Sequence, residues 1–286
     1  MDKYTAINDG NGAAPPRRLV LKVGSRVLTG GTPELRRDRL ERIVAAIAQH
    51  EGTQTVLVTS GAVAAGFAGL SLPAPPASAP ARQAAAAIGQ ARLIRAYAEL
   101  FEARGRRIGQ VLLTGDVLRS RPRFLAARRA LEAMFEAGVH PIVNENDVVA
   151  SEDVRVGDND NLAAYTAALV RADLLVLLTD VAGVYDRDPH RHPDARIIAE
   201  VAAPGELRAY CWGARGPEST GGLRTKLQAA ATAAAHGIPT VIASGLEADT
   251  LDAVYGGRPV GTRIRAGVLL PSRTDRAPVP AERRGA

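Results

Sequence analysis

The sequence has few of the features that mark secreted or membrane proteins. Cys211 is its one cysteine, so no disulfide can form within the chain and a reducing compartment is favoured. No apolar run reaches the ~18 residues that a membrane-spanning helix needs, and residues 1–16 lack the apolar core of a signal peptide. We therefore expect a cytoplasmic protein that binds no membrane, with a disordered leader at 1–16 and a flexible tail at 271–286.

Aromatic residues are also scarce, at 4% of the chain, although the net charge is +6. Proteins that bind nucleic acid combine a dense basic stripe with aromatic side chains. The arginines of this sequence are scattered along its expected helices and its tail instead. We therefore expect no nucleic-acid partner, and we assign the positive potential to an anionic small substrate.

Strand-like and helix-like segments alternate along the rest of the chain. The expected helices include 33–49, in which Pro33 occupies the first turn, 82–104 and 121–137. The expected strands are 17–23, 55–58, 109–114, 141–143, 172–179 and 240–243, with further short β segments between 258 and 270. This alternation predicts an α/β fold with a mostly parallel central sheet and helices on both faces.

The helix expected at 82–104 is rich in alanine. Small side chains permit close packing, so we expect its apolar face to lie in the core or in a contact between subunits. The residues that the helical period places on this face are Ala84, Ile88, Ala91, Ala98 and Phe101.

Two clusters of polar residues stand at the ends of expected elements. Residues 144–147, with the sequence NEND, follow the strand at 141–143, and residues 158–161, with the sequence DNDN, precede an apolar helix. Asn and Asp are common in turns and at helix N-caps, so each cluster alone has a structural explanation. Together they place carboxylates and amides at strand ends, where open α/β sheets bind ligands. The sequence therefore predicts a site for a small polar molecule.

A lysine and a serine follow the first two expected strands. Burying an unpaired ammonium is costly, so Lys22 at the end of its strand requires an anion nearby. Ser60 and Gly61 form a turn between a strand and a helix, where a hydroxyl and backbone N–H groups suit a carboxylate or a phosphate. A simple N-cap is the alternative explanation of Ser60.

A glycine-rich turn provides the third signal. Residues 220–222, with the sequence TGG, precede a helix that carries Lys226 in its first turn. Glycine backbone at a helix N-terminus suits a nucleotide phosphate, although the spacing is not that of a Walker A loop. Two lysines on opposite sides of a site, Lys22 and Lys226, would neutralise a phosphoryl group during transfer, with Asp160 between them.

Two histidines raise the question of a metal site. His190 and His192 lie two residues apart in a polar loop. No further ligand accompanies them, so we expect an exposed loop and no metal ligands from the protein.

The segments that carry these signals resemble the glutamate 5-kinases of the amino acid kinase family. The combination of NEND, GDNDN and TGG-x-x-TK is specific to this branch, and the resemblance spans residues 17 to 245. It implies a three-layer αβα sandwich, for which we expect a single kinase domain at 17–270. The similar segments are RLVLKVGSRVLTGG (18–31), LVTSGAVAAG (57–66), PIVNENDVV (141–149), VGDNDNLAA (156–164), LLTDVAGVY (177–185) and STGGLRTKLQAA (219–230).

The resemblance implies transfer of the γ-phosphate of ATP to the γ-carboxylate of L-glutamate, the first step of proline biosynthesis, with Mg²⁺ accompanying ATP. It assigns catalysis to Lys22, Asp160 and Lys226. It assigns the glutamate pocket to Ser60, Asn144, Asp147 and Asn159. The residues that it assigns to the nucleotide are Lys22, Gly24, Ser25, Thr179, Asp180, Thr220, Gly221, Gly222, Leu223, Arg224, Thr225 and Lys226.

The sequence departs from the family pattern at a few positions. Ser25 and Arg26 stand where two small hydroxyl residues are usual. In the nucleotide loop, Ser219 and Leu223 replace a glycine and a methionine, and Arg224 replaces a small residue. None of these removes a proposed catalytic group, although Ser219 would stiffen the loop. The PUA domain that many relatives carry at the C-terminus is also missing from the expected domain organisation.

The resemblance further implies a homo-oligomer, either a dimer or a tetramer. Because glutamyl phosphate is reactive, we also expect contact with a glutamyl phosphate reductase. Two alternatives stay open: a related kinase with another acidic acceptor, and a nucleotide-binding regulator without catalysis. A degenerate kinase would be expected to have lost at least one of Lys22, Asp160 and Lys226, and all three are present.

Overall fold

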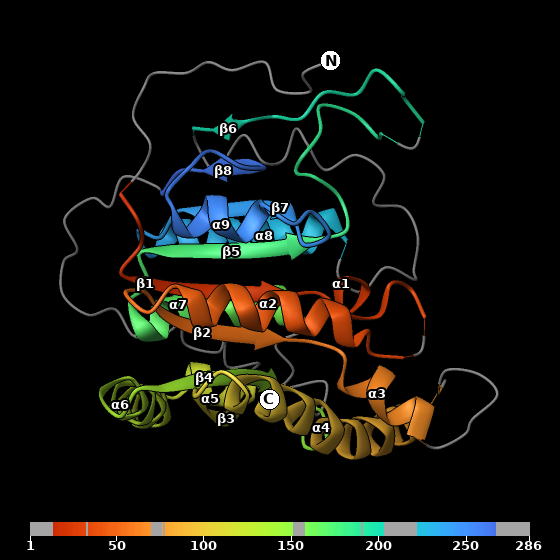
Figure 1. Cartoon of the computed structure of the whole chain (residues 1–286), viewed down its shortest axis with the longest axis vertical. Helices are drawn as coiled ribbons and strands as arrows, with labels where there is room; N and C mark the ends of the chain where they lie inside the picture. Colours follow the sequence, from red (N-terminus) through yellow and green to blue (C-terminus); the bar gives the residue numbers. More distant parts are fainter. Residues whose placement is uncertain are drawn as a thin grey trace, which may run out of the picture.

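The structure is a computed structural model, and an eight-stranded sheet forms its centre (Figure 1). The structure describes residues 14–32, 34–69, 76, 78–150, 158–189, 191–202 and 222–266. The expectations for most of the leader, for His190, Ser219, Thr220 and Gly221, and for the tail fall outside these residues. The strands are β1 (Arg18–Val23), β2 (Gln54–Thr59), β3 (Arg107–Leu113), β4 (Val139–Glu145), β5 (Leu174–Thr179), β6 (Glu200–Val201), β7 (Thr240–Ser244) and β8 (Thr262–Ile264).

The strand order is β3-β4-β2-β1-β5-β7-β8-β6. All neighbouring pairs are parallel except β7 and β8. Lys22 in β1 is opposite Val58 of β2 on one side and Leu177 of β5 on the other. The carboxyl ends of β1, β2, β4 and β5 therefore share one edge, and β1 is the strand at which the order of the chain reverses.

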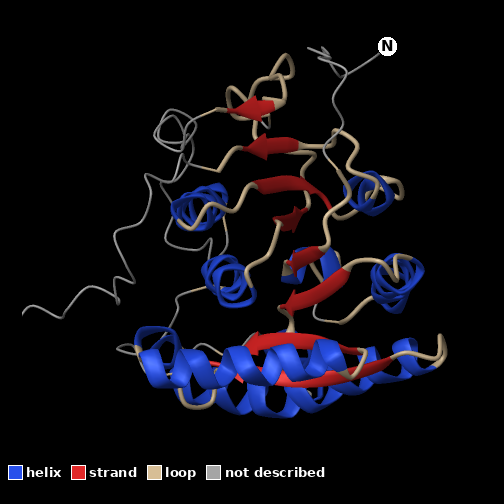
Figure 2. Cartoon of the chain, turned by 90° about the vertical axis from the view of Figure 1, so that its left-hand side faces the viewer, coloured by secondary structure: helices blue, strands red, loops and turns tan. Residues whose placement is uncertain are grey.

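Helices cover both faces of this sheet (Figure 2). One hydrophobic cluster joins the sheet to α1 (Ser25–Thr29), α2 (Arg37–Gln49), α3 (Ala62–Gly69), α4 (Ala79–Glu102) and α9 (Thr250–Tyr255). A second cluster joins the opposite face to α6 (Arg121–Glu136), α7 (Asn159–Val170) and α8 (Leu223–Ala235), and the short α5 (Gly115–Arg119) precedes α6. Among the described residues, no helix has both the length and the apolar character that crossing a bilayer requires.

The side-chain alternation of β1 decides which layer each residue meets. Leu19, Leu21 and Val23 belong to the first hydrophobic cluster, whereas Val20 belongs to the second. Because successive strand residues point to opposite faces, Lys22 shares the face of Val20 and is directed toward α7 and α8.

The expected strands and the mostly parallel α/β sheet are confirmed, with differences at the margins. No sequence pattern predicted the two-residue β6 or the five-residue α1. The first long helix begins at Arg37, later than the expected start at 33, and Pro33 itself lies outside the described residues. Of the β segments expected between 258 and 270, the described residues contain β8 alone.

The apolar face predicted for α4 is correct at Phe101, which is buried in the core, but wrong between Ala84 and Ala91. Ala84 and Ala91 are exposed, and Ile88 is 37% exposed. The face that enters the core contains Ala85, Ala86, Gly89, Leu93, Tyr97, Leu100 and Phe101. Alanine occurs all round this helix and carries little information on phase, so Leu93 and Tyr97 determine which side is buried.

Close packing through small residues is nevertheless present, between α3 and α4. A Cβ atom on Gly89 would lie 1.7 Å from the carbonyl oxygen of Ala62. A Cβ atom on Gly66 would lie 1.7 Å from the carbonyl oxygen of Ala85. The two backbones therefore touch, and only glycine fits at either position.

Candidate active site

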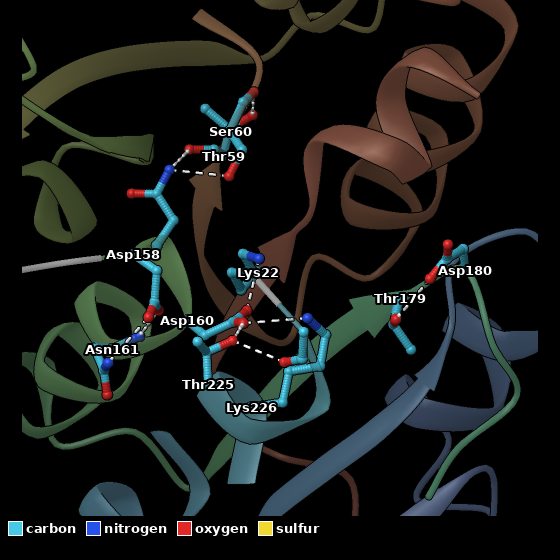
Figure 3. A network of polar contacts seen from close by, with 12 residues as sticks. Lys22, Thr59, Ser60, Asp158, Asp160, Asn161, Thr179, Asp180, Thr225 and Lys226 are labelled. Carbon is cyan, nitrogen blue, oxygen red and sulfur yellow. Dashed lines mark hydrogen bonds and ion pairs between the residues drawn. The ribbon is translucent and has the colours of Figure 1, made fainter. Parts of the chain in front are cut away.

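Polar residues gather where the carboxyl ends of the strands meet the N-termini of α7 and α8 (Figure 3). Asp158 is the N-cap of α7, and its side chain accepts a hydrogen bond of 2.8 Å from the backbone N–H of Asn161. The predicted Asp or Asn cap is thus confirmed. It fixes the first turn of α7, from which Asn159 and Asp160 project into the site.

A carboxylate between two ammonium groups forms the centre of the site (Figure 3). Lys22 Nζ lies 2.6 Å from Asp160 Oδ1, and Lys226 Nζ lies 3.1 Å from Asp160 Oδ2. The exposed fractions are 4% for Lys22, 0% for Asp160 and 6% for Lys226. The structure therefore brings together the three residues for which the sequence predicted catalysis, although they come from β1, α7 and α8.

The hydroxyl of Thr225 also contacts this carboxylate. Its Oγ1 lies 2.8 Å from Asp160 Oδ2 and equally 2.8 Å from the carbonyl oxygen of Gly222. The hydroxyl has a single proton to donate. A bond to Asp160 holds the carboxylate in place from the same helix turn that carries Lys226.

Burial and charge shift the pKa values of these groups in opposing ways. Burial lowers the pKa of Lys22 below its usual value, although the charge of Asp160 acts against this. Burial alone would raise the pKa of Asp160, but the charges of Lys22 and Lys226 outweigh it and hold that pKa below its ordinary range. With Asp160 ionised and both lysines protonated, the cluster has a net charge of +1, which suits a phosphoryl group.

A network of amides lies beside the charged cluster. The Nδ2 atom of Asn159 lies 2.9 Å from the carbonyl oxygen of Thr59, from Ser60 Oγ and from Asn144 Oδ1. Asn144 in turn donates from Nδ2 to Gln90 Oε1 of α4 at 2.8 Å. The structure thus joins Ser60, Asn144 and Asn159, three of the residues predicted for the glutamate pocket.

The fourth residue predicted for that pocket is Asp147. It is half-buried in the turn that follows β4, at the same edge of the sheet. Within the described residues, the Oδ1 atom of Asn159 is buried and has no hydrogen-bond partner. A buried acceptor of this kind calls for a donor from a ligand.

The residues predicted for the nucleotide flank the other side of the cluster. Thr179 is the last residue of β5 and Asp180 follows it, and Thr179 Oγ1 donates to Asp180 Oδ1 at 3.1 Å. Arg26 Nη1 lies 3.6 Å from Asp180 Oδ2, and both side chains are exposed. A Cβ atom on Gly24 would lie 3.6 Å from Lys22 Nζ, so the backbone at this turn approaches the ammonium closely.

The remaining predicted nucleotide residues surround the start of two helices. Ser25 is the first residue of α1. Gly222 is the N-cap of α8, which Leu223, Arg224 and Thr225 continue. Arg224 is exposed, whereas Leu223 is half-buried against the second hydrophobic cluster.

Sequence reasoning missed Gln90 as a member of the polar network. It stands inside an alanine-rich helix that we assigned to packing, and no motif surrounds it. The backbone carbonyl of Thr59 was missed for a similar reason, because its role depends on how β2 meets α7. No pattern within the sequence identifies either contact.

The comparisons with known proteins agree with this geometry. The model of the amino acid kinase family matches residues 17–244. The chain is 47% identical over 249 residues to a glutamate 5-kinase of Moorella thermoacetica, covering 86% of this chain and 66% of that protein. It is 46% identical over 248 residues to a glutamate 5-kinase of Symbiobacterium thermophilum, covering 86% of this chain and 95% of that protein. The chain thus spans about two thirds of the first relative and nearly all of the second.

Solved structures agree on the fold. The product complex of isopentenyl phosphate kinase from T. acidophilum has a TM-score of 0.61 at 19% identity and covers 87% of this chain and 100% of its own. UMP kinase from Bacillus anthracis has a TM-score of 0.60 at 15% identity and covers 88% of this chain and 97% of its own. These similarities confirm the αβα architecture. The chain therefore belongs to the amino acid kinase family, within which its sequence groups with the glutamate 5-kinases.

Proposed function

We propose that this site binds ATP and L-glutamate side by side and transfers the γ-phosphate of ATP to the γ-carboxylate of glutamate. The product is L-glutamyl 5-phosphate, and the reaction is the first step of proline biosynthesis. The observation that carries the proposal is the buried Lys22–Asp160–Lys226 cluster, which lies between the amide network of Asn144 and Asn159 and the residues at the end of β5. Its excess positive charge stands where a phosphoryl group would pass from one side to the other.

Glutamate occupies the side of Ser60, Asn144, Asp147 and Asn159 in this proposal. The hydroxyl of Ser60 and the N–H groups at the start of α3 suit a substrate carboxylate. The carboxylate of Asp147 and the unpaired Oδ1 of Asn159 suit the α-ammonium. These contacts would leave the γ-carboxylate directed toward the two lysines.

ATP occupies the opposite side. We assign its binding to Thr179 and Asp180 at the end of β5 and to the turn and helix start at 220–226, with its phosphates near Lys22, Gly24 and Ser25. The N-terminus of α8, a helix of 13 residues, contributes positive partial charge toward these phosphates.

Phosphoryl transfer requires positioning and charge neutralisation more than acid–base chemistry. An oxygen of the γ-carboxylate attacks the γ-phosphorus, and the bond from that phosphorus to the β,γ-bridging oxygen breaks. No proton has to move, because the carboxylate is already ionised and ADP leaves as an anion. Lys22 and Lys226 stabilise the negative charge on the transferring oxygens, and Asp160 keeps the two ammonium groups in place.

Mg²⁺ is expected to enter the site with ATP. Among the residues that the structure describes, no group of three or more His, Cys, Asp or Glu side chains could hold a metal ion. The carboxylate of Asp160 is already engaged by Lys22, Lys226 and Thr225. The described residues therefore do not form a metal site of their own, and we propose that phosphate oxygens of ATP and water hold the ion.

The test is ATP turnover with Mg²⁺ and L-glutamate, in which hydroxylamine traps the acyl phosphate as a hydroxamate. We expect hydroxamate to form only when glutamate is present. Parallel reactions contain aspartate, acetylglutamate or UMP in place of glutamate. Hydroxamate from aspartate alone, or phosphate transfer to UMP, would show that the acceptor is wrong. Folded protein that binds ATP but acts on no acceptor would favour a regulatory role.

Two further proposals concern partners, the first from the chemistry of the product and the second from the family. An acyl phosphate hydrolyses readily, so we propose that a cytoplasmic glutamyl phosphate reductase consumes it and contacts this enzyme. We also propose a homo-oligomer, either a dimer or a tetramer. Light scattering tests the second proposal, and a coupled assay that shows no kinetic benefit from the reductase beyond removal of free product would contradict the first.

A further inference from the structure

We propose that Gln90, in the middle of α4, is a positioning residue for the amino-acid substrate. It accepts a hydrogen bond from Asn144 and so helps to hold the orientation in which Asn144 and Asn159 present their amides to glutamate. The inference rests on the proposed function, because it takes Asn144, Asn159 and Ser60 as the glutamate pocket.

The hydrogen bonds determine which way the amide oxygen and nitrogen of Asn144 and Asn159 face. Asn144 Oδ1 accepts from the backbone N–H of Glu145 and from Asn159 Nδ2, each at 2.9 Å. Its Nδ2 atom must therefore find an acceptor elsewhere, and Gln90 Oε1 lies 2.8 Å away. Asn144 is 2% exposed, so without Gln90 its amino group would be buried and unpaired, which is costly.

The orientation of the Asn144 amide in turn affects that of Asn159, which lies on the substrate side of the network. Because Asn144 and the carbonyl oxygen of Thr59 both accept from Asn159 Nδ2, that amide has its nitrogen turned inward. Its Oδ1 atom is left as the buried acceptor without a partner. A donor on the substrate, such as the α-ammonium of glutamate, satisfies it. Gln90 thus stabilises the one arrangement in which Asn159 offers an oxygen to the ligand.

Contacts of α4 on both sides of Gln90 along the helix hold this residue in place. The preceding residue, Gly89, touches the backbone of α3, where a Cβ atom would lie 1.7 Å from the carbonyl oxygen of Ala62. Two turns further along, the fully buried Tyr97 shares a hydrogen bond of 2.9 Å with Thr59 Oγ1 at the end of β2. Figure 1 shows α3 and α4 side by side below the end of β2. A side chain on such a rigid support can fix the orientation of its neighbours.

The effect should be confined to one substrate. The residues assigned to ATP lie at the ends of β1 and β5 and at the start of α8, and no hydrogen bond joins Gln90 to those of them that the structure describes. Loss of its acceptor should therefore weaken glutamate binding and leave ATP binding unchanged. A residue that only stabilises the fold would alter both.

The experiment compares Gln90→Met, which keeps the length of the side chain but removes the acceptor, with Gln83→Met as a matched control. Gln83 is half-buried two turns earlier in α4. We expect Gln90→Met to raise the KM for glutamate about 5- to 10-fold, the factor given by one lost neutral hydrogen bond. The KM for ATP should stay near that of the wild type, whereas the thermal unfolding temperature of Gln90→Met should fall somewhat, because the buried amino group of Asn144 loses its acceptor. All parameters of Gln83→Met should stay near those of the wild type.

A double-mutant cycle tests whether Gln90 acts through Asn144. In an Asn144→Ala background, Gln90→Met should raise the KM for glutamate no further, because the donor is already gone. Additive effects would overturn the inference. If Asn144→Ala does not fold, Gln90→Met alone tests the inference. Equal increases in the KM for glutamate and the KM for ATP would indicate a purely structural role and overturn it.

The outcomes also separate this inference from the proposed function. If Ser60→Ala and Asn144→Ala raise the KM for glutamate and Gln90→Met does not, the pocket stands and the role of Gln90 is wrong. If neither pocket variant changes this KM, the pocket itself is wrong and the inference with it. A wild-type protein without glutamate-dependent turnover overturns both at once.

Discussion

Lys22 Nζ and Asp160 Oδ1 form an ion pair of 2.6 Å in which both side chains are almost fully buried. The free energy needed to remove two charges from water can exceed the free energy of their attraction, so a buried ion pair is weak evidence of a stabilising role. The second cation on the same carboxylate, Lys226, makes the cluster less favourable still. This arrangement is better explained by the charge that it holds ready for a phosphoryl group.

Replacing Lys226 by methionine should abolish most of the activity and preserve the fold. The variant removes one ammonium from the transferring phosphoryl group, and we expect kcat to fall at least about 100-fold, as for other groups that stabilise transition-state charge. The pair of Lys22 and Asp160 stays neutral overall, so folding should persist. Hydroxamate formation measures kcat, and circular dichroism checks the fold. Near-normal turnover of Lys226→Met would contradict the assigned role.

Thr225 offers a second test through a matched pair of variants. Thr225→Val keeps the shape of the side chain but cannot donate to Asp160, whereas Thr225→Ser keeps the hydroxyl. A hydrogen bond to a charged group contributes about 1.5–3 kcal/mol, so we expect kcat of the valine variant to fall about tenfold or more. The serine variant should stay close to the wild type. Full activity of Thr225→Val would mean that the hydroxyl bonds only to the carbonyl of Gly222.

The pH dependence of kcat should have an alkaline limb that reports on Lys22. Its ammonium is needed for catalysis, and burial lowers its pKa below the ordinary value of 10.5. Activity should therefore decline as the pH rises through this lowered pKa, at a pH below 10.5. The stability of the protein changes with pH in the opposite direction to the activity. The folded state releases the proton of Lys22 at a lower pH than the unfolded state does, so between the two pKa values the free energy of unfolding rises with pH.

Asp158→Asn should shift this limb to lower pH. The charge of Asp158 raises the pKa of Lys22, and asparagine removes that charge while remaining a good N-cap. Asp252→Asn, at an exposed position of α9, provides the control, for which no shift is expected. Initial rates across the alkaline range measure both variants. An unchanged limb in Asp158→Asn would show that another group controls it.

The contact between α3 and α4 can be tested at Gly89. An alanine there would place its Cβ 1.7 Å from the carbonyl oxygen of Ala62, so the backbones must move apart. Overpacking of this kind costs about 1–3 kcal/mol, and urea denaturation should show a loss of at least this size. Gly52→Ala is the control, since a Cβ at that position meets nothing within 4 Å. Equal stability of the two variants would refute the close contact.

Much of this architecture follows from local patterns in the sequence. The strand ends and the N-cap of α7 were predictable, because apolar periodicity and capping residues act over a few neighbouring positions. Asp158 illustrates this, since the sequence alone identified a cap at the start of α7. The resemblance to a known family then related Lys22, Asp160 and Lys226 to one another, although they are far apart in the chain.

What the sequence could not provide depends on contacts between distant elements. The phase of α4 was mispredicted because alanine on every side gives no preferred face, and only packing against α3 and the sheet resolves it. Gln90 was missed for the same reason. Its partner Asn144 belongs to β4, and the two meet only through the packing of α4 against the sheet.

The burial of Lys22 and Lys226 has a consequence for spectroscopy. The sequence contains a single further lysine, Lys3, near its N-terminus. A protein labelled with ¹⁵N only in lysine side chains would therefore give a spectrum with at most three ammonium signals. Exposed ammonium protons exchange rapidly with water, whereas buried and hydrogen-bonded ones exchange slowly. The surviving signals would report the protonation of the two site lysines directly, and nucleotide binding could be followed there without any probe attached to the protein.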